Sequence, residues 1–190
     1  MTSVPAAVHP EAVPGDPSTM RWVVPAGLLP PGALLRAPGA LGALLADSTL
    51  TDGLVEHAAV WLTLPDGSWF EQGAYVRSAL QSALGDPAGW IVDETAHDAA
   101  LARIVAGVLA GSVGDYVRSH GGALQVADVT DGVVRIALDG TCDHCPAAGL
   151  TLHARVETAV RERWPALAGV RQEGSDLDAR SALSRWLRRS

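Results

Sequence analysis

The sequence predicts an α+β fold made of two small domains, of which the C-terminal one has the order helix, hairpin, CxxC loop, helix, strand. Three observations support this prediction. Apolar residues in the second half recur first at helical spacing and then with the period of two that is typical of strands. An Asp-Gly pair, which favours tight hairpin turns, separates the two alternating segments. Residues 85–89 combine a helix stop with turn residues and are therefore the expected boundary between the halves.

The first half begins with residues 1–17, whose prolines among small residues predict a disordered lead-in. Residues 20–24 predict a short strand. Prolines between residues 25 and 46 exclude one long helix there, because proline lacks the amide hydrogen that a helix interior requires. Only a short helix ending near Asp47 is expected in this segment.

A second strand is expected over residues 58–64, where the turn signal Pro65-Asp66-Gly67 follows. Apolar residues then recur at helical spacing over residues 70–84. Residues 18–85 are therefore predicted to form a small α+β domain, and residues 86–94 a linker.

The second half opens with a helix predicted over residues 95–119, with a kink near Gly111 because glycine weakens a helix interior. His120 followed by two glycines ends this helix, since glycine readily adopts the positive φ of a helix C-terminus. A hairpin follows, with Asp131-Gly132 as its turn.

Residues 140–146, with the sequence GTCDHCP, form the expected cysteine loop after the hairpin. A helix is predicted over residues 147–163 and a last strand over residues 168–172. These elements complete a predicted domain over residues 95–173. Leucines, a tryptophan and arginines then predict a basic amphipathic tail over residues 174–190.

Composition excludes several classes of function. The 190 residues carry 21 acidic and 14 basic side chains, so the net charge of −7 argues against a nucleic-acid surface. All basic residues are arginine, which excludes Schiff-base and P-loop lysine chemistry. Residues 1–17 lack the features of a secretory signal. The longest apolar stretch, residues 99–113, contains Arg103 and is too short to span a bilayer. We therefore expect a cytoplasmic protein with no membrane span.

The chain has two cysteines, Cys142 and Cys145, at CxxC spacing directly before a predicted helix. Amide groups at a helix N-terminus stabilise thiolates, which favours redox reactivity or metal ligation. Zinc requires four ligands, and adding His120 and His144 gives a spacing that fits no standard zinc finger. A thioredoxin-like dithiol also opens a helix after a strand, although the preceding elements give no βαβ pattern.

An iron–sulfur cluster, as a rule, requires four thiolates, and one chain supplies two. A symmetric dimer would supply four across its two-fold axis. An incidental, purely structural pair of cysteines is the fourth interpretation. The residues by themselves leave these alternatives open.

Three segments, residues 117–122 (VRSHGG), 128–134 (DVTDGVV) and 140–146 (GTCDHCP), resemble the C-terminal domain of NifU, the Nfu-type iron–sulfur scaffold and carrier proteins. The resemblance covers roughly residues 97–173. It implies a domain that binds a cluster, expected to be [4Fe–4S], between two subunits and passes it to recipient proteins. Cys142 and Cys145 would then be the cluster ligands and no residue would be catalytic.

The same resemblance implies a homodimer when loaded, with recipient apoproteins and cluster assembly factors as partners. The residues between the cysteines, Asp143 and His144, depart from the small residues usual in the family. Residues 16–22 and 60–64 are similar, more faintly, to the Nfu N-terminal domain, which makes residues 18–85 a diverged version of it.

The function predicted from the sequence is therefore a non-enzymatic iron–sulfur scaffold or carrier. The alternative is a thiol–disulfide oxidoreductase with Cys142 as nucleophile and Cys145 as resolving thiol, and zinc binding is a third option. The other candidate residues have simpler interpretations. His57 and His153 show no partnering pattern, and a solvated helix start accounts for five further residues, Glu71, Asp93, Glu94, His97 and Asp98.

Overall fold

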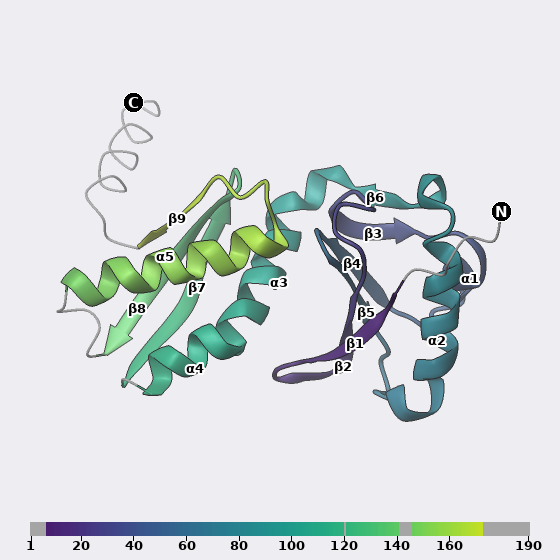
Figure 1. Cartoon of the computed structure of the whole chain (residues 1–190), viewed down its shortest axis with the longest axis horizontal. Coiled ribbons are helices and arrows are strands. Elements are labelled where there is room, and N and C mark those ends of the chain that lie inside the picture. Colours follow the sequence, from purple (N-terminus) through teal and green to yellow (C-terminus); the bar gives the residue numbers. More distant parts are fainter. Residues whose placement is uncertain (1–6, 120, 141–145, 173–190) are drawn as a thin grey trace, which may run out of the picture. The chain divides into compact units, whose positions relative to one another are not determined.

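The computed structural model describes residues 7–119, 121–140 and 146–172. They form an α+β fold of two compact units, each drawn in Figure 1. The first unit contains the described residues up to Ala100 together with the segment Glu162–Pro165. The second contains Leu101–Arg161 and the described residues from Ala166 onward. The predicted fold class is confirmed.

The first unit is built on a six-stranded antiparallel sheet with the strand order β1-β2-β5-β4-β3-β6. Strands β2 and β5 overlap the two segments in which the sequence predicts strands, residues 20–24 and 58–64. The bounds of the six strands are β1 His9–Val13, β2 Asp16–Val23, β3 Gly32–Arg36, β4 Asp52–Glu56, β5 Ala59–Thr63 and β6 Ile91–Asp93.

Two helices, α1 (Gly39–Ala46) and α2 (Trp69–Ala83), cover one face of this sheet. Helix α1 confirms the short helix expected to end near Asp47, and α2 confirms the helix predicted from helical spacing. Alternate residues of a strand point to the same face, and the core face includes Trp22, Val60 and Leu62, packed in one cluster with apolar residues of both helices. The two helices therefore bury this face of the sheet.

The opposite face carries a buried carboxylate. Glu56 is 1% exposed and accepts hydrogen bonds from Arg21 Nε at 2.6 Å and from the indole of Trp61 at 3.1 Å. Arg21 also pairs with Glu11 at the edge of the sheet, at 2.5 Å. Burial lowers the pKa of Arg163, an effect that the charge of Glu56 opposes. Paired charges therefore occupy this face.

Two predictions for the first unit are wrong in part. The expected disordered lead-in contains β1, which pairs with β2 through a turn in which Gly15 has a φ of +79°. Proline is tolerated in β1 because an edge strand need not donate every amide. The expected linker over residues 86–94 contains a 3₁₀ turn, η1 (Pro87–Gly89), and β6, which pairs with β3.

The second unit has the predicted order of elements. A 3₁₀ turn, η2 (Glu94–Ala96), leads into α3, and the break between α3 and α4 bends the chain by 50° at the predicted position near Gly111. The elements are α3 His97–Ala110, α4 Ser112–Ser119, β7 Gly122–Thr130, β8 Val133–Gly140, α5 Pro146–Arg163 and β9 Gly169–Gln172.

The sheet of the second unit has the order β7-β8-β9, with β7 antiparallel and β9 parallel to the central β8. Parallel neighbours need a crossover connection, and α5 provides it. The unit therefore contains a β8-α5-β9 crossover, which begins at the cysteine loop, whereas the elements before that loop are helices and an antiparallel hairpin, as expected.

Two further predictions concern the rest of the chain. Among the described helices, none is by itself long and apolar enough to cross a membrane. Of these described helices, only the bent pair Glu94–Ala110 and Ser112–Ser119, taken together, has the length and composition of a membrane span. The predicted basic tail over residues 174–190 lies outside the described residues.

Candidate functional site

The candidate site is the connection between β8 and α5. Cys142 and Cys145 belong to residues 141–145, which lie outside the described residues, as does His120. The elements on either side are described: the central strand β8 ends at Gly140, and α5 begins at Pro146. A helix start has backbone amides without intrahelical partners, and proline is well suited to its first position. The sequence therefore attaches both thiols to a helix N-terminus.

The hairpin brings a second segment to the same end of the sheet. Gly122 of β7 pairs with Gly140 of β8, whereas the turn at Asp131 and Gly132 lies at the other end. The start of β7, which follows α4, and the end of β8, which precedes the cysteines, therefore lie side by side in the sheet. Gly122 is the last residue of the segment 117–122 and Gly140 is the first residue of the segment 140–146, so a strand pairing joins the two segments.

The hairpin turn has the predicted geometry. Asp131 and Gly132 have φ values of 52° and 71°, and two consecutive positive values define a type I′ turn. The carbonyl of Gly132 accepts a hydrogen bond from the amide of Ala168 at 2.9 Å. Near the turn, Asp128 forms an ion pair with Arg135 across a bulge in β7. These contacts set the register on which the opposite end of the hairpin depends.

The break between α3 and α4 requires Gly114. A Cβ atom at this position would lie 1.7 Å from the backbone oxygen of Leu109, so no larger residue fits without a backbone shift. At Gly111 the nearest atoms would be 3.5 Å or more away, an ordinary contact. The bend therefore depends on Gly114, although the sequence indicated Gly111.

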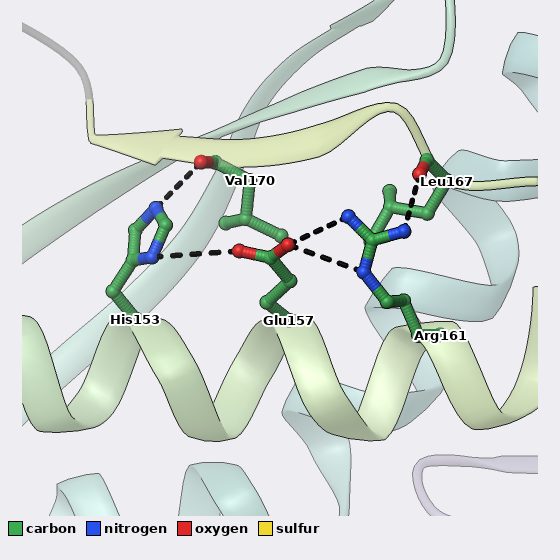
Figure 2. A network of polar contacts seen from close by, with 5 residues as sticks. All are labelled: His153, Glu157, Arg161, Leu167 and Val170. Atoms are coloured by element: carbon green, nitrogen blue, oxygen red, sulfur yellow. Dashed lines mark hydrogen bonds and ion pairs between the residues drawn. The ribbon is translucent and has the colours of Figure 1, made fainter. Parts of the chain in front are cut away.

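A polar network joins α5 to the chain around β9 (Figure 2). The ring of His153 lies 2.5 Å from the carbonyl oxygen of Val170 and 3.9 Å from the carboxylate of Glu157. Arg161 donates to Glu157 at 2.7 Å and 3.2 Å and to the carbonyl oxygen of Leu167 at 2.8 Å. Since β9 pairs with β8, these bonds hold α5 along the strand that precedes the cysteine loop.

This network was not predicted, although the sequence contains a signal for it. His153, Glu157 and Arg161 are spaced four residues apart, and side chains at this spacing are neighbours on a helix surface. A cation–π contact also joins α4 and α5, because the guanidinium of Arg155 lies 4.4 Å from the ring centroid of Tyr116.

The acidic residues before α3 have the expected structural role. Asp93 accepts hydrogen bonds from the hydroxyl and the amide of Thr95, at 2.7 Å and 2.8 Å. These bonds lower the pKa of Asp93. His97 packs edge-on against Trp164, with ring centroids 5.7 Å apart. Within the described part of the chain, no group of three or more His, Cys, Asp or Glu residues could hold a metal ion.

The second unit is thus a small α+β module with a CxxC loop between the central strand and the helix that crosses over it. The family model described as "NifU-like domain" matches residues 105–171. Residues 105–171 are therefore a NifU-like domain, which confirms the resemblance seen in the sequence. The similarity of the first half to the Nfu N-terminal domain lies outside these residues and stays a prediction.

Curated relatives match part of the chain. The "Fe/S biogenesis protein NfuA" of Teredinibacter turnerae is 37% identical over 76 residues, 40% of this chain and 39% of the relative. The "NifU-like protein 1, chloroplastic" of Arabidopsis thaliana is 36% identical over 58 residues, 30% of this chain and 25% of the relative. The Edwardsiella ictaluri "Fe/S biogenesis protein NfuA" is 30% identical over 79 residues, 41% of each chain. In each case the match spans less than half of the relative's length.

Proposed function

We propose that this protein takes part in iron–sulfur cluster biogenesis as a scaffold or carrier, without being an enzyme. The observation that carries the proposal is the NifU-like domain at residues 105–171, which contains the CxxC loop. Relatives named "Fe/S biogenesis protein" that match the chain support the same role. The cluster is the cargo of the protein, and Cys142 and Cys145 are the residues proposed to hold it.

Ligand counting gives the proposed assembly. A cubane cluster takes about four thiolates, and each chain supplies two. Two copies related by a two-fold axis would contribute equally, so the loaded form is proposed to be a homodimer with one [4Fe–4S] cluster. Ligands on a loop at a helix N-terminus suit transfer to recipient apoproteins, because an incoming thiolate can replace them one at a time.

A thiol–disulfide oxidoreductase is the second candidate, and one observation favours it. The CxxC loop follows a strand and opens α5, which crosses over to the parallel strand β9. Redox dithiols occur in this strand–CxxC–helix setting. In that case Cys142 would attack a substrate disulfide and form a mixed disulfide, and Cys145 would release the reduced substrate by forming the Cys142–Cys145 disulfide.

Anaerobic reconstitution with ferrous iron and sulfide distinguishes the two candidates. A carrier is expected to develop a broad visible absorption band and to hold about four iron ions per two chains. Single Cys142→Ser and Cys145→Ser variants should lose both signals, whereas Ser119→Ala serves as the matched control and should retain them. A colourless protein that catalyses the reduction of an insulin disulfide by dithiothreitol would overturn the proposal in favour of the oxidoreductase.

A further inference from the structure

A groove of about 340 Å³ lies in the first unit, between α2 and the edge hairpin of β1 and β2. The hairpin contributes Met20 and Trp22 to its lining, and α2 contributes Phe70, Gly73 and Arg77. Met20 and Trp22 belong to the sheet face that α2 covers. Their strand partners, Ala12 and Pro10, belong to β1, the edge strand of the sheet. The groove therefore forms where the helix no longer covers the edge strand.

The walls of the groove are aromatic, and one of them is uncovered. Trp22 packs edge-on against Trp69, with ring centroids 5.9 Å apart. Phe70 has a relative exposure of 102%, so its ring gains nothing from burial in this chain. A fully exposed aromatic ring on the rim of an apolar groove is typical of a surface that another molecule covers.

Gly73 keeps the floor of the groove open. It lies inside α2, where glycine is less favourable than alanine. A Cβ atom at this position would meet nothing within 4 Å, and the residue is not among the glycines with positive φ. Neither close packing nor backbone conformation therefore requires glycine here. Its effect is to leave space above the helix between Phe70 and Arg77.

Arg77 gives the groove its charge. It is exposed, and it forms no hydrogen bond or ion pair with the residues that the structure describes. The lining residues other than Arg77 are all uncharged. Arg77 lies seven positions after Phe70, which places both on one helix face and roughly 10 Å apart along its axis. An extended chain covers this distance in about three residues, because each residue advances it by about 3.3 Å.

We propose that this groove binds an extended segment of a partner protein in which an apolar side chain and a carboxylate are three residues apart. The apolar side chain packs against Trp22 and Phe70, the backbone of the segment passes over Gly73, and the carboxylate pairs with Arg77. This binding site is independent of the cluster function proposed above, since every residue in it belongs to the first unit.

The test is a titration of the full-length protein with the peptide acetyl-Ser-Leu-Ser-Ser-Glu-Ser-amide, followed through the indole N–H resonances of Trp22 and Trp69 in NMR spectra. Saturable shifts of these two resonances are expected. Replacing the glutamate of the peptide by glutamine, or Arg77→Gln in the protein, should weaken binding at least about tenfold, the usual effect of losing a charged hydrogen bond.

Two further variants separate binding from folding. Gly73→Met is expected to raise the melting temperature, because methionine favours helices over glycine, and yet to weaken peptide binding at least about tenfold by filling the groove. Phe70→Ala should also weaken binding, whereas Tyr75→Ala, which removes the other exposed aromatic ring of α2 outside the groove lining, should leave it unchanged.

Three results would overturn the proposal. The first is the absence of saturable shifts with the wild-type protein. The second is peptide binding that Gly73→Met and Phe70→Ala leave unchanged. The third is self-association of the wild-type protein in sedimentation experiments that Phe70→Ala abolishes, because the occupant of the groove would then be a second copy of this chain.

Discussion

Gly122 of β7 pairs with Gly140 of β8 at the end of the hairpin opposite its turn. This pairing attaches the segment after α4 and the cysteine loop to the same end of the second unit. The register of the hairpin therefore decides which residues reach the candidate site, and a slip of one residue would turn every side chain of a strand to the other face.

The turn that sets this register is sensitive to a single methyl group. Gly132→Ala should lower the free energy of unfolding by about 1 kcal/mol, because the φ of 71° at this position is strained for any residue with a Cβ atom. Urea unfolding followed by circular dichroism measures the change. Gly169→Ala, where φ is not positive and a Cβ would meet open space, is the control and should be nearly neutral. Equal effects of both substitutions would contradict the assigned turn.

The break between α3 and α4 gives a paired prediction. Gly114→Ala is expected to destabilise the protein by about 2 kcal/mol or more, because its Cβ would lie 1.7 Å from the backbone oxygen of Leu109. Gly111→Ala meets only ordinary contacts and should be neutral or slightly stabilising. Thermal unfolding of both variants tests the difference, and a larger loss at Gly111 would refute the geometry of the bend.

The buried carboxylate of the first unit predicts a large effect. Glu56→Ala should cost about 3–5 kcal/mol, since it leaves the buried indole N–H of Trp61 without an acceptor and the half-buried Arg21 without its buried partner. Glu11→Ala removes the exposed partner of the same Arg21 and should cost less than about 1 kcal/mol. If chemical denaturation gave similar losses for both, the charged pair would not be buried as described.

The pKa values of two aspartates, Asp66 and Asp93, are lowered for different reasons. The hydroxyl of Thr95 is the main cause of the lowered pKa of Asp93, whereas the backbone amide of Ser68 is the main cause at Asp66. Both lowered values stabilise the fold above the ordinary aspartate pKa of 3.8, and this contribution is lost as the pH falls through the lowered pKa of the folded state.

Thr95→Val should therefore raise the pKa of Asp93 toward its ordinary value, while Ser68→Ala should change that of Asp66 less, because its amide remains. NMR titration of the side-chain carboxyl carbons measures both values. A larger rise at Asp66 than at Asp93 would contradict this assignment of causes.

The elements that the sequence predicted well are those with local signals. Helix α5 follows from helical spacing and strand β5 from the turn signal that closes residues 58–64. The hairpin turn follows from Asp131-Gly132 alone, because these two residues favour the positive φ values of a type I′ turn. The kink near Gly111 was also predicted, although the steric requirement lies at Gly114. That requirement depends on the packing of one turn on the next and has no local pattern.

The elements that were missed depend on distant partners. Strand β1 is almost wholly exposed and contains Pro10, so its residues resemble a disordered segment until β2 pairs with them. Strand β6 has three residues and exists because β3 lies beside it. Strand β4 begins with Asp-Gly, which suggests a turn. In each case a neighbouring strand overrides a weak local preference.

The candidate site and the groove also combine residues that have a local sequence pattern with contacts between distant residues. Cys142 and Cys145 were proposed from the sequence because CxxC spacing before a helix is a local pattern, and their role as ligands stays a prediction, although the family match covers both positions. The contact of His153 with Val170 joins residues 17 apart and could not be predicted from a pattern within α5. The groove beside Phe70 likewise requires the packing of α2 against a hairpin some 50 positions earlier in the chain, beyond the reach of any local motif.

Native mass spectrometry of the anaerobically reconstituted protein measures the proposed cluster binding, because one mass reports both the number of chains and the inorganic content. We expect a species of two chains with about four iron and about four sulfide ions. The species should be absent from Cys142→Ser and Cys145→Ser preparations treated in the same way. A single chain without iron, or a cluster that survives in both variants, would contradict the proposal.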